Sequence, residues 1–147
     1  MDRIDYWAKQ SNLNPDIVRA VVSVESGGDT YAVRYEPNWK WWLDLDGWAA
    51  LVNVTKATEQ ICQSMSWGLM QIMGAVAREL GMKDDLSRLC DPEYGLKYGC
   101  MKLRQNLDKF GTIERALAAY NAGSPASKTG QAYAAKVLSK IKSSSIA

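Results

Sequence analysis

The fold is decided by residues 14–28, which read NPDIVRAVVSVESGG. Asn14 followed by Pro15 is typical of a helix start, because Asn caps the first turn and Pro fits the first helical position. The two glycines at the end of the stretch are a stop signal. We therefore expect a helix over residues 16–26.

One acidic residue of this helix lies on its apolar face. Val18, Val21, Val22 and Glu25 are spaced i, i+3, i+4 and i+7, so the carboxyl shares a stripe with three valines. It also lies in the last turn, where the helix dipole is negative. Desolvation and the dipole both raise the pKa of a carboxyl, which suits a general acid near neutral pH. The alternative is that Glu25 turns outward at a frayed helix end.

Helical patterns cover most of the remaining chain. Capping residues and periodicity predict helices over residues 4–10, 55–65, 68–80, 92–110 and 129–142, and one from the Thr112 cap to residues 121–123. The Ser-rich end after residue 142 is expected to be loose. Residues 29–54 show no helical period. The prediction is a single, mainly α domain over residues 1–147, with a possible small β region in residues 29–54.

Composition excludes several classes of enzyme. The 147 residues include no histidine, which rules out Ser-His-Asp and Cys-His catalysis and the HExxH zinc site. With 47% hydrophobic and 23% charged residues, the chain has a globular composition. Cys62, Cys90 and Cys100 form no CxxC pair, so neither a metal nor a cofactor is expected. Cys90 and Cys100 are either a disulfide or two buried thiols.

Charge is distributed unevenly along the chain. Residues 97–147 carry nine basic and two acidic residues, a net charge of +7, whereas residues 1–96 carry nine and fourteen, a net charge of −5. A basic end favours an anionic polymer or surface as partner, although a solvated helix face is an equal alternative. The lone charged pairs elsewhere are interpreted as surface charge.

The first residues are acidic where a signal peptide needs an apolar run, and no stretch approaches the length of a membrane helix. We expect synthesis in the cytoplasm without a signal peptide and no stable membrane insertion.

Four of the six tryptophans fall in residues 29–54, namely Trp39, Trp41, Trp42 and Trp48. Indole faces pack against the apolar faces of pyranose rings, so the group could form a sugar-binding platform. It could equally be a satellite core beneath a long loop.

Three short motifs follow one another along the chain in an order that is typical of one protein family. They are VESGG at residues 24–28, SWGLMQIM at residues 66–73 and AAYNAG at residues 118–123. In this order they resemble the ES, GLMQ and AYN motifs of the soluble-lytic-transglycosylase family, which is related to goose-type lysozyme. The resemblance covers about residues 12–140. Residues 34–37 and 89–100 further resemble phage- and prophage-encoded members.

The resemblance implies an α+β lysozyme-like fold and cleavage of the MurNAc-β-1,4-GlcNAc bond of peptidoglycan. Glu25 would be the single catalytic acid and base: it protonates the leaving oxygen and then accepts the proton of the sugar's own 6-hydroxyl. That hydroxyl closes a 1,6-anhydro-MurNAc ring, and no water is consumed.

The resemblance also implies roles for the other motif residues. Tyr120 would donate its hydroxyl toward Glu25. Substrate contacts would come from Ser26, which also holds the loop after Glu25, from Met70 and Gln71 beside the scissile bond, and from Asn121 and Tyr133. For Met70, Tyr120 and Tyr133 the alternative role is core packing.

The spacing departs from compact family members, because more residues separate Glu25 from the GLMQ motif. The extra length contains Glu36, Asp44 and Asp46, and a second carboxylate opposite Glu25 would activate water and give a hydrolysing muramidase. Glu36 is the first candidate. A catalytically idle wall-binding or tail module is a further alternative, whereas nucleic-acid binding lacks a motif. The expected partner is peptidoglycan, bound by a monomer that reaches the bacterial wall after phage-type release or as a virion component.

Overall fold

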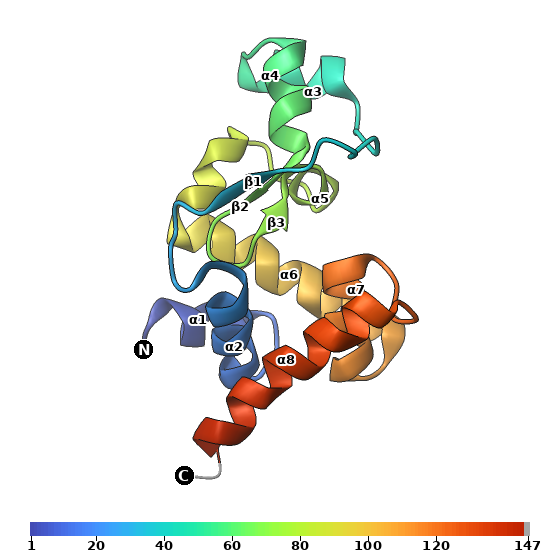
Figure 1. Ribbon diagram of the computed structural model, residues 1–147. Helices are drawn as coiled ribbons and strands as arrows, with labels where there is room; N and C mark the ends of the chain where they lie inside the picture. The colour runs from blue at the N-terminus through green and yellow to red at the C-terminus, as the bar shows by residue number, and fades with distance from the viewer. Residues whose placement is uncertain (146–147) are drawn as a thin grey trace.

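The computed structural model describes residues 1–145, with side chains up to residue 141 (Figure 1). In chain order its elements are α1 (Arg3–Gln10), α2 (Pro15–Ser26), β1 (Val33–Tyr35), α3 (Leu45–Val52), α4 (Lys56–Gln63), β2 (Met65–Trp67), β3 (Ile72–Met73), α5 (Gly74–Glu79), the 3-10 helix η1 (Leu86–Cys90), α6 (Pro92–Phe110), α7 (Ile113–Ala122) and α8 (Lys128–Ser145). The prediction of a mainly α fold is confirmed, and one strand of its small sheet, β1, lies in residues 29–54, where β structure was expected, while β2 and β3 lie outside that range.

Helix α2 begins and ends where the sequence indicates. The side chain of Asn14 accepts a hydrogen bond of 2.9 Å from the amide of Asp16, and Pro15 occupies the first turn. Gly27 ends the helix in the left-handed conformation, with a φ of 62°. Glu25 therefore lies in the last turn of α2, just before the chain changes direction at Gly27.

The lower part of the molecule is a helical core around α2 and α6 (Figure 1). Most of its buried side chains come from α2, α6, α7 and α8, and they include Val18, Val21, Leu96, Leu103, Leu117 and Val137. Because α6 is 19 residues long, it continues from this core to a second one in the upper part. That second core joins Trp67, Ile72, Met82, Leu86, Leu89 and Tyr98.

A small antiparallel sheet lies in the upper part, in the order β1-β2-β3. Arg34 of β1 is opposite Ser66 of β2, and Ser66 is opposite Met73 of β3. The predicted helix over residues 68–80 is therefore wrong in its first half: residues 68–71 form a tight turn, and α5 starts only at Gly74. Gly68 has a φ of 73°, and a side chain there would collide with the carbonyl oxygen of Leu89.

Residues 29–54, for which no helix was predicted, supply β1 and also the helix α3. The side chain of Asp44 caps α3 by accepting a hydrogen bond of 3.2 Å from the amide of Gly47. Together α3 and α4 form a helical pair at the end of the upper part, beyond the sheet (Figure 1).

The remaining predicted helices hold within a few residues, and α6 has the expected limits. Helix α8 continues to Ser145, so residues 143–145 of the end that was expected to be loose are helical, while residues 146–147 lie outside the described part. No helix in the described part is long and apolar enough to cross a membrane.

The three cysteines are free thiols, so Cys90 and Cys100 do not form the disulfide considered above. Cys100 is fully buried beside Met70, and this burial raises the pKa of its thiol to about 12. It packs as a small apolar side chain.

Candidate active site

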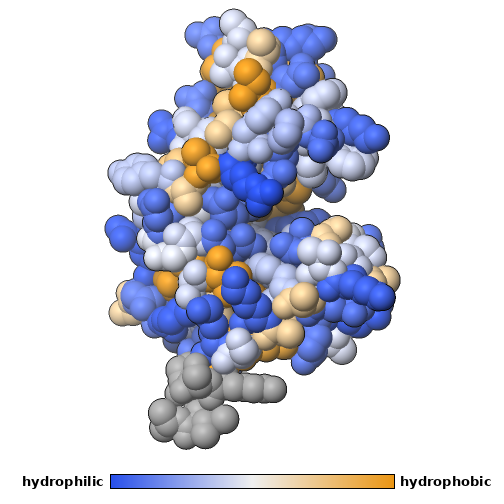
Figure 2. Space-filling view, in the orientation of Figure 1, coloured by the Kyte–Doolittle hydropathy of each residue, from blue (hydrophilic) through white to orange (hydrophobic). Residues whose placement is uncertain are grey.

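A cavity of about 580 Å³ lies between the upper and lower parts of the molecule. Figure 2 shows the surface indented between these two parts. The lining side chains come from the end of α2, from the sheet, from the segment between β1 and α3, from the end of α7 and from the start of α8: Glu25, Arg34, Glu36, Asn38, Trp39, Trp41, Ser66, Gln71, Met73, Tyr120, Asn121 and Thr129. The cavity thus brings together residues that are far apart in the sequence.

Glu25 is half-buried in the wall of this cavity. Burial raises the pKa of its carboxyl, as the sequence pattern predicted, while the hydroxyl of Tyr133 and the positive charges of Arg34 and Lys136 partly oppose this rise. The carboxyl therefore keeps its proton to a higher pH than an exposed glutamate, and groups that favour its ionised form stand close to it.

The two tyrosines of the site have different partners. The hydroxyl of Tyr120 donates a hydrogen bond of 2.7 Å to the carbonyl oxygen of Met70, which corrects the expectation that it donates to Glu25. The hydroxyl of Tyr133 is buried without a regular hydrogen bond and acts on the pKa of Glu25. Burial and the charge of Glu25 raise the pKa of both tyrosines, so both stay neutral hydroxyls.

The two residues expected to line the cleft beside the scissile bond behave differently. Met70 is fully buried against α6, where it belongs to the lower core, so its predicted place in the cleft is wrong. Gln71 does line the cavity, in a left-handed conformation with a φ of 49°. Its amide nitrogen donates to the carbonyl oxygens of Ala32 and Gly68 at 2.9 and 3.0 Å, and its amide oxygen accepts from Ser66 at 3.0 Å.

The tryptophans of residues 29–54 have different surroundings. Residues 36–44, which we call the Trp segment, connect β1 to α3 without regular secondary structure. Within it, Trp39 and Trp41 line the cavity, with their ring centroids 5.2 Å apart and edge to face. The indole nitrogen of Trp39 is buried without a hydrogen-bond partner. Trp48, beyond the segment, packs instead on the guanidinium of Arg78, 4.8 Å from its ring centroid.

The cleft continues past the Trp segment into a second cavity of about 820 Å³. The two cavities share Trp39, Trp41, Met73, Tyr120 and Asn121. The second is lined further along by α5, by the C-terminal half of α6 and by the turn after α7, and it receives the side chains of Glu79, Lys102 and Lys109. The two cavities together form one groove, lined by Glu25 in the first cavity and by two lysines in the second.

The sequence profile of the Transglycosylase SLT domain matches residues 2–142, which is nearly the whole described chain. The chain belongs to this family. The resemblance that three short motifs indicated is thereby confirmed.

A transglycosylase of Enterobacteria phage PRD1 is similar to this SLT domain, with 30% identity over 135 residues. The match covers 90% of this chain but 39% of the phage protein, so the chain spans about two fifths of the length of that relative. No solved structure matches the chain significantly.

The structure shows the contacts and positions of two further motif residues, Ser26 and Asn121. The hydroxyl of Ser26 donates to the carbonyl oxygen of Leu69 at 2.8 Å and accepts from the amide of Gly28 at 3.2 Å. Ser26 thus fastens the end of α2 to the turn that carries Gln71. Asn121 is exposed at the end of α7 and lines both cavities, where its amide can reach a ligand.

Glu36 lines the same cavity as Glu25 but already has a cationic partner. The Arg34 guanidinium lies 3.0 Å from its carboxylate, and the same guanidinium lowers the pKa of Glu25. Among the described residues no group of three or more His, Cys, Asp or Glu side chains is placed to hold a metal ion.

Sequence reasoning missed several residues around the site. Arg34, Asn38, Ser66, Met73 and Thr129 line the cavity through the sheet, the Trp segment and the start of α8. Arg34, Ser66 and Met73 lie in stretches that the motif search quoted, but nothing local showed that these side chains meet at the cavity, because their convergence depends on tertiary structure. A buried ion pair between Glu59 and Arg78 was also missed, since isolated charges were interpreted as surface charge.

Proposed function

We propose that this SLT domain is a peptidoglycan lytic transglycosylase that cleaves the MurNAc-β-1,4-GlcNAc bond and leaves 1,6-anhydro-MurNAc ends. The observation that carries the proposal is Glu25, a half-buried carboxyl with a raised pKa in the wall of a long cleft. Family membership and the printed name of the phage relative support it.

Glu25 would act first as an acid and then as a base. Because its pKa is raised, the carboxyl can carry a proton to the leaving glycosidic oxygen near neutral pH. The carboxylate that remains is stabilised by the hydroxyl of Tyr133 and by the charges of Arg34 and Lys136. It then takes the proton of the 6-hydroxyl of the same muramic residue, whose oxygen closes on the anomeric carbon. That internal attack has a high effective concentration and needs no positioned water.

Tyr120 and Gln71 would hold the geometry of the cleft. The hydrogen bond from Tyr120 to the carbonyl of Met70 ties α7 to the turn between β2 and β3. Gln71 links that turn to Ala32, just before β1, and to Ser66 of β2 through its hydrogen bonds to both. Asn121, at the rim, would contact the glycan directly.

The Trp segment would supply the saccharide-binding wall. Trp41 is 63% exposed and presents an aromatic surface to the cleft. The unpaired indole N–H of Trp39 is a donor that a hydroxyl or acetamide oxygen of the glycan can satisfy, and buried donors are rarely left without a partner. The second cavity gives room for further sugars beyond the scissile bond.

A hydrolysing muramidase needs a second carboxylate that can activate water. Glu36 is the candidate in this cavity, and its ion pair with Arg34 does not favour that role. We propose that the domain works as a monomer on the bacterial wall, reached by phage-type release or as part of a virion. Neither nucleic acid nor membrane insertion belongs to this proposal.

Mass spectrometry of the soluble products from purified peptidoglycan tests the reaction. Products that end in 1,6-anhydro-MurNAc, absent with Glu25→Gln, are expected. Reducing MurNAc ends would instead show that water attacks and would turn attention to Glu36. Undiminished turnover by Glu25→Gln would remove the proposed acid.

A further inference from the structure

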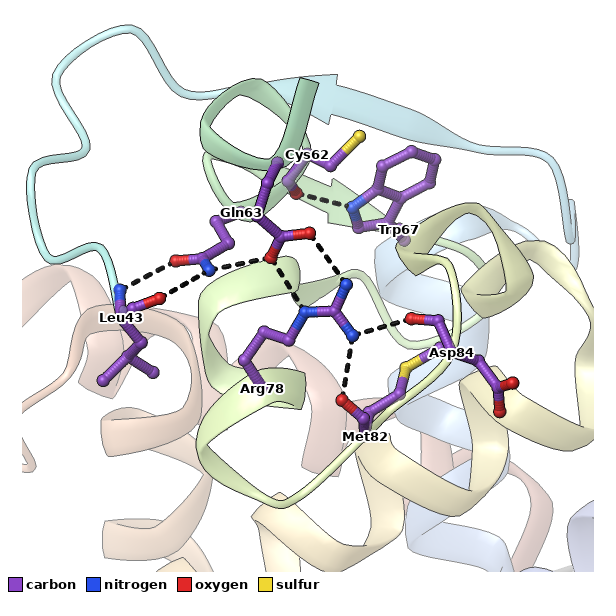
Figure 3. Close-up of polar contacts among 8 residues, drawn as sticks. Leu43, Cys62, Gln63, Trp67, Arg78, Met82 and Asp84 are labelled. Atoms are coloured by element: carbon purple, nitrogen blue, oxygen red, sulfur yellow. Dashed lines mark hydrogen bonds and ion pairs between the residues drawn. The ribbon is translucent and has the colours of Figure 1, made fainter. Parts of the chain in front are cut away.

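A network of buried polar side chains lies behind the Trp segment, outside both cavities. The side chains of Glu59, Gln63 and Arg78 are at most 2% exposed. Arg78 of α5 donates two hydrogen bonds of 2.8 Å to the carboxylate of Glu59 on α4. It also donates to the carbonyl oxygens of Met82 and Asp84, at 2.8 and 2.6 Å (Figure 3). The guanidinium is therefore fixed from two sides.

Gln63 extends this network to the Trp segment. Its amide nitrogen donates to Glu59 at 2.8 Å and to the carbonyl oxygen of Leu43 at 2.9 Å. Its amide oxygen accepts from the amide of Leu43, also at 2.9 Å. Figure 3 shows the side chain of Gln63 reaching across to both backbone groups of Leu43. The side chain of Gln63 thus pairs with the backbone N–H and C=O of Leu43, as a neighbouring strand does in a sheet.

Ser64, the next residue, holds the rest of the segment. Its hydroxyl accepts a hydrogen bond of 2.9 Å from the indole nitrogen of Trp42, and its carbonyl oxygen accepts one of 2.9 Å from the amide of Glu36. Between these anchors the segment has no regular secondary structure, so its path depends on contacts with the end of α4. Trp39 and Trp41 lie between the anchors and face the cleft.

The network also joins the two sides of the groove. Helix α5, which carries Arg78, contributes Val76 and Glu79 to the second cavity, while the Trp segment contributes Trp39 and Trp41 to both cavities. A buried ion pair adds little stability compared with apolar residues of the same volume, because both charges must lose their hydration. A directional network does, however, fix one arrangement of the groups that it connects.

We infer that Glu59, Gln63 and Arg78 are positioning residues for substrate binding: through Leu43 they set the Trp segment, and with it Trp39 and Trp41, at a fixed distance from α5 across the groove. This inference rests on the proposed function. It assigns to the network an effect on glycan binding and none on the bond-breaking step, which belongs to Glu25.

The test uses Gln63→Met, which keeps the side-chain length and removes the three hydrogen bonds. Gln60→Met is the matched control, because it makes the same change earlier on α4 at a half-exposed side chain outside the network. Ser64→Ala, which removes the acceptor of the Trp42 indole and leaves the ion pair intact, is a second variant in case Gln63→Met does not fold.

The first measurement is amide hydrogen exchange, which needs no substrate. In Gln63→Met we expect exchange over residues 38–44 to accelerate at least tenfold, with Gln60→Met like the wild type. In Ser64→Ala a smaller acceleration is expected, centred on Trp42. Unchanged exchange in both Gln63→Met and Ser64→Ala would show that the network does not fix the segment, and the inference would fail.

The second measurement is the kinetics on soluble glycan strands of six or more sugars. We expect Gln63→Met to raise KM about five- to tenfold, with kcat within twofold of the wild type and an unchanged pH profile. A structural defect reaching Glu25 would lower kcat and move the pH profile, which would overturn the inference, as would faster exchange with an unchanged KM. If the wild type itself neither binds nor cleaves glycan, the proposed function fails, while the exchange data still decide whether the network holds the segment.

Discussion

The hydroxyl of Tyr120 donates its hydrogen to the carbonyl oxygen of Met70, 2.7 Å away, and so is committed to the backbone. Tyr133 is left as the tyrosine whose hydroxyl acts on the carboxyl of Glu25. Both tyrosines lie near the carboxyl, since its charge raises the pKa of each. Their roles nevertheless differ: Tyr120 ties α7 to the turn before β3, and Tyr133 favours the ionised form of the acid.

Replacing these tyrosines by phenylalanine separates the two roles. The Tyr133 hydroxyl lowers the pKa of Glu25, so in Tyr133→Phe that pKa rises and the basic limb of the pH–activity profile moves to higher pH. We expect kcat to fall severalfold, because the carboxylate left after proton transfer loses a neighbouring hydroxyl that favours its ionised form. Tyr120→Phe, the matched control, should keep the basic limb in place and lower the unfolding free energy by about 1 kcal/mol. A profile that moves only in Tyr120→Phe would reverse the assignment.

Glu25→Gln is expected to abolish turnover and to change how stability depends on pH. The pKa of Glu25 is higher in the folded than in the unfolded chain, so folding favours the protonated carboxyl. Below the pKa of the unfolded chain the carboxyl is protonated in both states, so its titration does not lower the free energy of unfolding. As the pH rises from there through the folded pKa, the wild type loses stability and the amide variant does not.

Thermal unfolding of the wild type and Glu25→Gln across this pH range measures the effect. The Tm of the variant should exceed that of the wild type at neutral pH, and the difference should shrink toward acid pH. A constant difference would mean that the carboxyl does not titrate with a raised pKa.

Local signals explain why some elements could be predicted from the sequence. Helices α2 and α6 both begin with a cap followed by proline and end at a glycine, and each of these signals acts within one turn. Glu25 was found in the same way, from its spacing on α2. The turn at residues 68–71 was not, because an apolar run that follows a glycine also fits a helix. What favours the turn there is the antiparallel pairing of β2 with β3, and the Leu89 carbonyl from another part of the chain leaves no room for a side chain at Gly68.

The missed parts of the site depend on partners that are distant in sequence. Arg78 lies among alanines on a short helix, and nothing near it shows that Glu59 will meet it in the interior. Met70 follows Leu69 in a motif associated with the cleft, yet only the packing of α6 shows that its side chain is buried. Tyr120 and Tyr133 are equivalent candidates by residue type, and only the place of the Met70 carbonyl distinguishes them.

Gly68→Ala tests how far the turn before β3 depends on glycine. A methyl group there needs a left-handed backbone and also collides with the carbonyl of Leu89, so we expect a loss of about 3 kcal/mol or more. Gly28→Ala is the control, because Gly28 is left-handed with a φ of 86° but nothing lies within 4 Å of the added carbon. That variant should lose about 1 kcal/mol. Equal losses in urea unfolding would show that the close contact with Leu89 relaxes easily.

Glu59→Gln tests how strongly the fold depends on the buried ion pair. Removing one partner leaves the guanidinium of Arg78 buried without a counter-charge, which costs about 3–5 kcal/mol in unfolding free energy. Asp108→Asn breaks the ion pair with Arg104 on the surface of α6, and about 0.5 kcal/mol or less is expected there. Urea unfolding of both variants measures the contrast, and a loss below about 1 kcal/mol for Glu59→Gln would mean that water reaches the guanidinium.

The two lysines of the second cavity are expected to make binding to the wall depend on salt concentration. Lys102 and Lys109 line the groove beyond the Trp segment, where the carboxylates of a stem peptide of the wall would lie. In Lys102→Gln/Lys109→Gln we expect binding to purified peptidoglycan to weaken about three- to tenfold at low salt, and the difference from wild type to shrink as salt screens the charges. Binding to uncharged N-acetylglucosamine oligomers serves as the control, since such a ligand offers the lysines no charge. Equal losses for the oligomers and the wall would show that the lysines shape the groove instead of attracting an anionic substrate.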